Sequence, residues 1–215
     1  MNGEKITIHN YYEAYFPTFN ILNGYKITDD LITISTKDFD NVKLHLENNN
    51  GDVHGVFFEQ VYDFLKVKDK IVLDIGANIG DSSIYFTLKG AKKVIALDPN
   101  QAGAGSATDS VTGGVKIPLK TLEELVHEFK IPDGSVIKID CEGCEIDVIK
   151  FSDKKTLQKF SQIIIEYHYG YKDLKYKLEN CGFKVVTTSP LFLLNRQSNT
   201  NMYHGYLYAT NISKI

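Results

Sequence analysis

The stretch from Lys70 to Asn100 constrains the fold most, because its residues have the order strand, turn, helix, strand. Ile71–Leu73 is a short apolar run rich in β-branched residues, which is typical of a buried strand. Gly76–Gly80 predicts a tight turn, and Asp81–Ser83 supplies side chains that begin helices. Val94–Leu97 predicts a second buried strand. The stretch therefore predicts a β-α-β unit in which an acidic residue follows each strand.

The turn and the two strand ends predict a site for a nucleoside. Asp98 follows the second strand, where nucleotide-binding folds place a carboxylate that accepts the ribose hydroxyls. Gly76 and Gly80 have no Cβ, so a ligand can approach the backbone closely. The helix that follows directs its unpaired N–H groups and the positive end of its dipole toward the turn. We therefore expect a nucleoside whose sugar meets Asp98.

The rest of the ligand is less certain from these residues alone. A dinucleotide site favours G-x-G-x-x-G, whereas Asn78 stands here in place of the second glycine. Asp74 would lie close to a pyrophosphate and repel it. A ligand with an ammonium and a sulfonium group, such as S-adenosylmethionine, suits acidic surroundings better. An NAD-type oxidoreductase and a non-catalytic nucleoside-binding module remain the alternatives.

Four motifs in the same order resemble the FkbM family of S-adenosylmethionine-dependent methyltransferases. They are V-L-D-I-G-A-N-I-G-D-S-S, V-I-A-L-D-P-N, I-K-I-D-C-E-G-C-E and I-I-I-E-Y-H, and they lie between Phe57 and about His168. The resemblance implies an α/β fold, a Rossmann-like class I methyltransferase sandwich with a mostly parallel sheet and an antiparallel C-terminal strand. It also implies S-adenosylmethionine as the cofactor and O-methylation of a small molecule or a sugar hydroxyl.

The resemblance assigns the cofactor to the turn and to the residues after the second strand. The predicted cofactor-binding residues are Asp74, Gly76, Ala77, Asn78, Gly80, Asp81, Ser82, Ser83, Asp98, Pro99 and Asn100. In an open parallel sheet, ligands bind beyond the carboxyl ends of the strands. We therefore expect these residues to share one rim of the sheet with the catalytic groups.

The predicted catalytic residues are Asp140, Glu142 and His168. Methyl transfer requires an acceptor atom held in line with the methyl carbon, and a hydroxyl acceptor also benefits from a base. Asp140 follows a predicted strand, and the resemblance places it beside the methyl donor. His168 titrates near neutrality and follows another strand. Two bland alternatives stay open: His168 bonds a carbonyl at a strand end, and Glu142 favours a helix dipole.

The cysteines and the remaining histidines predict neither a disulfide nor a metal ion. Cys141-x-x-Cys144 has a redox or zinc spacing, but it lacks a second ligand pair, and three cysteines argue against a disulfide framework. We therefore interpret this spacing as a coincidence. The other histidines are scattered without ligand spacing: His9, His45, His54, His127 and His204.

Residues 1–56 are predicted to form an aromatic-rich appendage, and residues 57–215 the methyltransferase domain. Val42–Leu46 alternates like a half-exposed strand, and a turn signal follows it, so we expect a hairpin that ends near Val56. Phe58–Leu65 predicts an amphipathic helix, whose Glu59 or Tyr62 could border the cofactor. An aromatic cluster precedes the hairpin and either packs in the core or lines a pocket: Tyr11, Tyr12, Tyr15, Phe16 and Phe19.

The segment after Asn100 departs from the expected pattern. Gln101–Gly114 is small and polar, which predicts a flexible loop, and the usual second helix and third strand are not recognisable. Either that layer is lost, or residues are missing from the sequence between Asn100 and about Gly103. We favour the second explanation, because a sheet without its outer strand would have a raw edge. Val115–Leu119 predicts an edge strand.

The C-terminal half alternates strands and helices. A capping box begins a helix at Thr121. Strands are predicted at 135–140 and 163–168, helices at 145–150 and 171–180, and a final antiparallel strand pair at 183–188 and 206–210.

Composition supports an ordinary soluble enzyme. The net charge of −3 gives no electrostatic reason to expect nucleic acid as a partner, and no apolar run is long enough to span a membrane. The N-terminus lacks the layout of a secretion signal. We therefore expect a cytoplasmic enzyme with a small-molecule acceptor and no membrane partner. The acceptor's identity and the oligomeric state cannot be read from the sequence.

Overall fold

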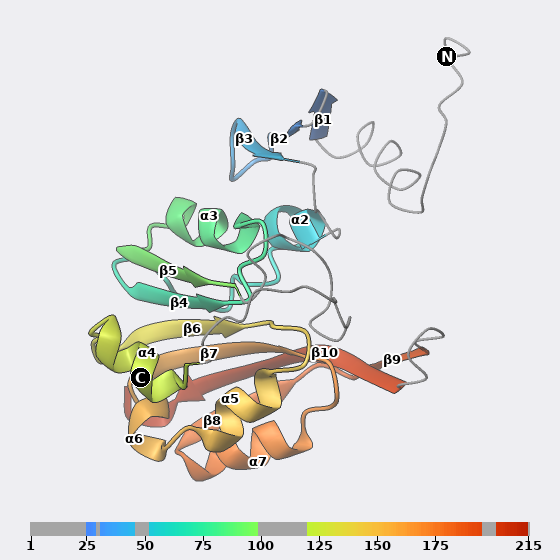
Figure 1. Ribbon diagram of the computed structural model, residues 1–215. Coiled ribbons are helices and arrows are strands. Elements are labelled where there is room, and N and C mark those ends of the chain that lie inside the picture. The colour runs from blue at the N-terminus through green and yellow to red at the C-terminus, as the bar shows by residue number, and fades with distance from the viewer. Residues whose placement is uncertain (1–24, 29–30, 46–51, 99–119, 195–200, 215) are drawn as a thin grey trace, which may run out of the picture. The chain divides into compact units, whose positions relative to one another are not determined.

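The computed structural model describes residues 25–28, 31–45, 52–98, 120–194 and 201–214 (Figure 1). The chain divides into two compact units, Met1–Val61 and Tyr62–Ile215. A domain boundary at residue 56 stays a prediction. The aromatic cluster, the glycine-rich loop and the edge strand predicted at 115–119 lie outside the described residues.

The first unit contains a small antiparallel sheet of β1 (Tyr25–Thr28), β2 (Leu31–Ile34) and β3 (Val42–His45). The strand predicted at Val42 is confirmed, but the predicted hairpin is wrong. β3 pairs with β2, which precedes it in the chain, and Ile34 lies opposite Val42. The residues after the turn are helical instead, so they offer β3 no strand to pair with.

The helical residues of the first unit also differ from the prediction. They form α2 (Asp52–His54) and a π-helical turn, η1 (Gly55–Glu59), which ends where Gln60 adopts left-handed dihedrals. Residues 61–65 form turns, so the helix predicted at 58–65 is wrong in its position. The apolar residues that suggested a helix face are nonetheless buried. Their spacing was compatible with burial in successive turns as well as along a helix.

The second unit is built on a seven-stranded sheet with the order β5-β4-β6-β7-β10-β8, and β9 pairs with β10 (Figure 1). Its strands are β4 (Ile71–Ile75), β5 (Lys93–Leu97), β6 (Ser135–Ile139), β7 (Phe160–Tyr167), β8 (Phe183–Thr187), β9 (Leu191–Leu194) and β10 (Asn201–Asn211). The first four strands of this order are parallel, and β10 is antiparallel to both of its neighbours. The mostly parallel sheet with an antiparallel C-terminal strand is thus confirmed.

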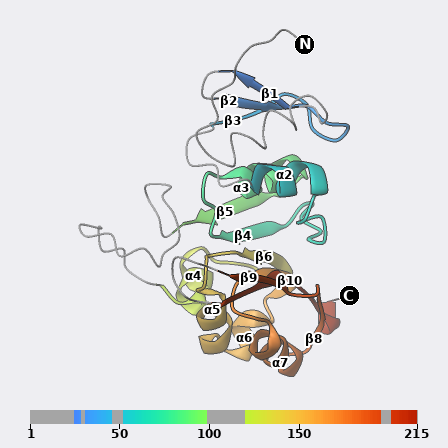
Figure 2. The same ribbon diagram turned by 90° about the vertical axis from the view of Figure 1, so that its right-hand side faces the viewer.

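Helices cover the sheet because its central strands are apolar on both faces. The helices of this unit are α3 (Asp81–Leu88), α4 (Leu122–Glu128), α5 (Glu145–Phe151), α6 (Lys154–Leu157) and α7 (Lys172–Asn180), with a short 3₁₀ turn, η2 (Ile212–Lys214). Every residue of β6 is buried, as expected for a parallel strand between two helical layers. Apolar side chains of α4, α5, α6 and α7 form one core with Ile137, Ile163 and their neighbours. Figure 2 shows α5, α6 and α7 grouped together.

The long strand β10 has two pairing partners at each of its ends. Residues 205–211 pair with β7 and β8, whereas residues 201–204 pair with β9 and project past the sheet (Figure 1). This arrangement brings His204 to the carboxyl end of β7. Within the described part of the chain, no helix is both long and apolar enough to cross a membrane. A cytoplasmic location stays a prediction.

The predicted capping box of α4 is confirmed, and it generates a stability prediction. The Thr121 hydroxyl accepts from the Glu124 N–H at 3.2 Å, and the Glu124 carboxylate accepts from the Thr121 N–H at 2.7 Å. Thr121→Ala should lower the free energy of unfolding by about 1 kcal/mol, because a helix N–H loses its partner. Urea unfolding measures the change. Thr121→Ser retains the hydroxyl and should resemble the parent; equal losses in both variants would contradict the capping role.

Candidate active site

The glycine turn after β4 is shaped by the end of β6. Gly76 has a φ of +77°, and a Cβ there would lie 1.5 Å from the backbone oxygen of Asp140. Glycine is therefore required at this position by the close approach of two backbones, and not by room for a ligand as the sequence suggested. Gly80 has a φ of +85°, and nothing lies within 4 Å of where its Cβ would be. The open space predicted over the turn is found at Gly80.

Asp98 is fastened to the same turn. Its carboxylate accepts a hydrogen bond of 2.7 Å from the backbone N–H of Asn78. Asn78 has a φ of 44°, a left-handed conformation that asparagine tolerates better than most residues. This is why Asn78 can stand where a dinucleotide site has glycine. The Leu97 carbonyl accepts from the N–H groups of Gly76 and Ala77, so the turn and the end of β5 are locked together.

Asp74 lies fully buried beneath the turn. One of its carboxylate oxygens accepts from the Ser82 hydroxyl at 2.7 Å and from the Ser83 hydroxyl at 2.6 Å. Asp81 and Ser82 are buried as well. These predicted cofactor residues therefore fix the turn to α3, whereas Asn78, Gly80 and Asp98 remain at least partly accessible. Pro99 and Asn100 lie outside the described residues.

Lys138 is a central residue that the sequence analysis missed. It lies on β6 with only 2% of its surface exposed, and its ammonium donates to the Gly76 carbonyl. Its Nζ lies 3.4 Å from Asp74 Oδ1 and 3.6 Å from Asp140 Oδ2. Burial alone would lower the pKa of Lys138, but the nearby carboxylates outweigh it and raise the pKa above its usual range. The available signal was a lysine inside an apolar strand.

Tyr62 contacts a predicted catalytic residue. Its hydroxyl donates to Asp140 Oδ2 at 3.4 Å, and its ring lies under the Lys138 ammonium, 5.6 Å from the ring centroid. Burial, followed by the charge of Asp140, raises the pKa of Tyr62 well above its usual value. The phenol therefore stays protonated and orients the Asp140 carboxylate.

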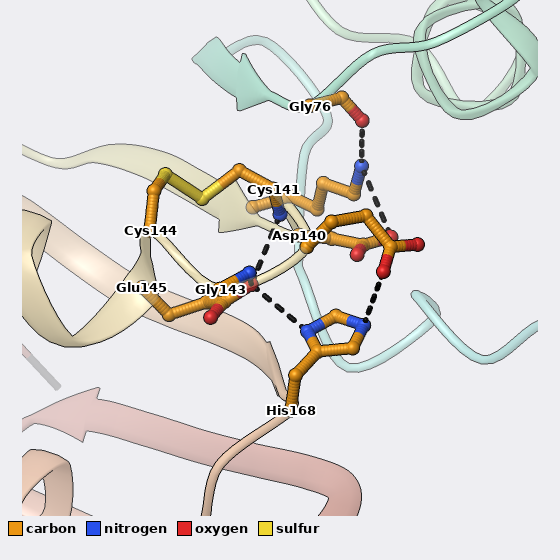
Figure 3. The surroundings of a disulfide bond; sticks show 9 residues. Gly76, Asp140, Cys141, Gly143, Cys144, Glu145 and His168 are labelled. Carbon is orange, nitrogen blue, oxygen red and sulfur yellow. Dashed lines mark hydrogen bonds and ion pairs between the residues drawn. A yellow bond between two sulfur atoms is a disulfide. The ribbon is translucent and has the colours of Figure 1, made fainter. Parts of the chain in front are cut away.

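The loop after β6 is closed by a disulfide between Cys141 and Cys144, which Figure 3 shows. The interpretation of this spacing as a coincidence is wrong. Glu142 and Gly143 have φ values of 56° and 121°, and these left-handed residues bend the loop back so that the two cysteine Cα atoms are 5.5 Å apart. The third cysteine, Cys181, is buried and unbonded.

His168 is held by a buried carboxylate on this loop. Its Nδ1 lies 2.9 Å from Glu145 Oε1, which also accepts from the N–H groups of Cys141 and Gly143 (Figure 3). Its Nε2 lies 3.4 Å from Glu142 Oε2. Burial alone would lower the pKa of His168, but the hydrogen bond and charge of Glu145, with Glu142, raise it to about 9. The partner of His168 is thus a carboxylate, where the bland alternative expected a carbonyl.

Two further residues complete the rim, and the sequence analysis gave neither of them a role. Glu166 lies on β7, and its carboxylate contacts His204 Nε2. The rings of His204 and His168 are 5.6 Å apart. The hydrogen bond from Glu166 raises the pKa of His204. Sequence spacing could not reveal this group, because only the pairing of β10 with β7 brings His204 to His168.

The strand order and the glycine turn together define a class I methyltransferase fold. A candidate methyltransferase solved in complex with SAH superposes with a TM-score of 0.51 at 12% sequence identity. The match covers 93% of this chain and 63% of that structure. At this identity the similarity concerns the fold alone.

The family is established by sequence. The model of the methyltransferase FkbM domain matches residues 38–185. The chain therefore belongs to the FkbM methyltransferase family, and the predicted resemblance is confirmed. The uncharacterised protein 158B of Sulfolobus islandicus rod-shaped virus 1 is 39% identical over 114 residues, which are 52% of this chain and 68% of that protein. The hexuronic acid methyltransferase AglP of Haloferax volcanii is 30% identical over 88 residues, which are 40% of this chain and 36% of AglP.

The two turn glycines provide a matched stability test. Gly80→Ala should cost about 1 kcal/mol, because alanine is strained at positive φ but meets open space. Gly76→Ala should cost roughly 3 kcal/mol or more, since its Cβ would also collide with the Asp140 backbone. Equilibrium unfolding of both variants measures the difference. Equal losses would show that β6 does not dictate the glycine at position 76.

Proposed function

We propose that the protein is an S-adenosylmethionine-dependent methyltransferase that methylates a hydroxyl group of a small molecule or a sugar. The observation that carries the cofactor assignment is the Asp98 carboxylate, which the Asn78 N–H fixes beside the glycine turn. A carboxylate at the end of this strand is positioned for ribose hydroxyls. The open space at Gly80 leaves the turn accessible from above.

The charges around the turn fit a cationic ligand. The carboxylates of Asp74, Asp81 and Asp140 surround one buried ammonium, that of Lys138, and Asp98 adds a further negative charge. The excess negative charge attracts a sulfonium and an ammonium and repels a pyrophosphate. This balance favours S-adenosylmethionine over the dinucleotide alternative.

The acceptor side is proposed to lie on the rim beyond β6 and β7. S-adenosylmethionine, when bound, would supply an electrophilic methyl carbon. Asp140 and Glu142 are the carboxylates placed to take the proton of an acceptor hydroxyl, and His168 orients Glu142 through its Nε2. The name of AglP, a hexuronic acid methyltransferase, supports a sugar as the acceptor class.

Calorimetric titration tests the cofactor. The parent should bind S-adenosylmethionine and not NAD. Asp98→Ala should weaken S-adenosylmethionine binding about 10-fold to 100-fold, because ribose hydroxyls lose a charged acceptor. Asp98→Asn, which keeps an oxygen for the Asn78 N–H, should fall between the two. A parent that binds NAD instead, or an Asp98→Ala variant with undiminished affinity, would contradict the assignment.

Transfer of a radiolabelled methyl group from S-adenosylmethionine to hexuronic acids and their glycosides tests the reaction. Asp140→Asn should lower kcat about 100-fold or more while cofactor affinity changes little, because only the base is lost. Asp133→Asn is the matched control, since Asp133 is exposed at the opposite end of β6. Labelling of neutral hexoses alone would refute the hexuronic acid class. An unchanged kcat in Asp140→Asn would remove this residue from the mechanism.

A further inference from the structure

Three metal-ligating side chains converge at the carboxyl end of β7. Glu166 lies on β7, His168 directly follows the strand, and His204 lies on β10. Each residue offers one ligand atom, and these atoms all lie within 4.8 Å of one another. A carboxylate and two imidazoles at this separation can surround a single ion.

The sheet holds these three residues in place. β10 pairs with β7 so that Tyr206 lies opposite Glu166 and Gly205 opposite Tyr167. The next residues, His168 and His204, are tied by a hydrogen bond of 3.0 Å from the Tyr203 N–H to the His168 carbonyl. Side chains two positions apart on a strand share a face. The group therefore stands on paired strands, which fix ligand geometry better than loops do.

A buried carboxylate orients the central imidazole. Glu145 Oε1 lies 2.9 Å from His168 Nδ1, and two backbone N–H groups hold that carboxylate in turn. Metal-ligating histidines commonly use one nitrogen for such a carboxylate and present the other to the ion. Nε2 is then the nitrogen available for a metal, and Glu142 Oε2 lies 3.4 Å from it.

We propose that Glu166, His168 and His204 bind one divalent transition-metal ion of the zinc class. Two imidazoles and one carboxylate favour such an ion over Mg²⁺ and Ca²⁺, which prefer oxygen ligands. Three protein ligands leave a position open, to which the exposed Glu142 or an oxygen of the acceptor can bind. That last role, the polarisation of an acceptor hydroxyl, rests on the proposed methyl transfer, but metal binding itself does not.

A second group on this rim is less suitable. Asp140, Glu142 and His168 also place ligand atoms within 4.8 Å of one another. However, Lys138 Nζ lies 3.6 Å from Asp140 Oδ2, and its buried positive charge would repel a cation there. Glu166 and His204 lie on the side of His168 where no lysine ion pair is found among the described residues.

Cobalt binding to the full chain tests the site without cofactor or substrate. The protein is stripped with a chelator under non-reducing conditions, its purification tag is removed, and it is titrated with Co²⁺ in the visible range and with Zn²⁺ in competition. The expected result is one Co²⁺ per chain, displaced by Zn²⁺ but not by Mg²⁺. His204→Asn and Glu166→Gln should each weaken binding at least about 100-fold, and Glu145→Gln about 10-fold to 100-fold.

The controls separate this site from other ligands. His127→Ala removes an exposed histidine of α4 and should bind Co²⁺ like the parent. Glu166→Gln preserves side-chain size, so it decides the matter even if His204→Asn does not fold. Undiminished binding in Glu166→Gln, absence of binding in the parent, or a sulfur-to-cobalt charge-transfer band from Cys141 and Cys144 would each overturn the proposal. Because the titration omits S-adenosylmethionine, its failure would leave the proposed methyl transfer intact.

Discussion

The buried ammonium of Lys138 is the interaction on which the rim of the sheet depends. Placing this charge inside the protein costs several kcal/mol of hydration on the order expected for a buried ion. The carboxylates of Asp74 and Asp140, with the Gly76 carbonyl, offset that cost. Each of these groups belongs to a different part of the site. Lys138 therefore joins the base of the glycine turn to the catalytic end of β6.

The glycine at position 76 and the lysine at position 138 solve one packing problem together. Gly76 lets the turn approach the backbone of Asp140, and this approach brings the Gly76 carbonyl within reach of Lys138. A side chain at position 76 would separate the two strands at the point where the ion pairs form. The cofactor half of the rim and the acceptor half are thus held in register by backbone contact, before any ligand binds.

The sequence predicted those parts of the fold that depend on local patterns. The β-branched runs gave the parallel strands, and the capping box gave the start of α4. Patterns that need a distant partner were less informative. The strand at Val42 was predicted, but its partner β2 was not, because alternation does not say which neighbour a strand pairs with. Likewise, C-x-x-C spacing alone did not reveal that two left-handed residues close the Cys141–Cys144 loop.

The antiparallel strand β10 explains why the acceptor side of the rim was hardest to foresee. In the parallel part of the sheet, functional residues follow strand ends, so Asp98 and Asp140 could be found by locating the strands. β10 runs the other way, so its first residues reach the same rim and carry His204 beside His168. A strand that enters the rim by its start leaves no strand-end signature in the sequence. The same reversal lets a mostly parallel sheet place two imidazoles and a carboxylate on one face.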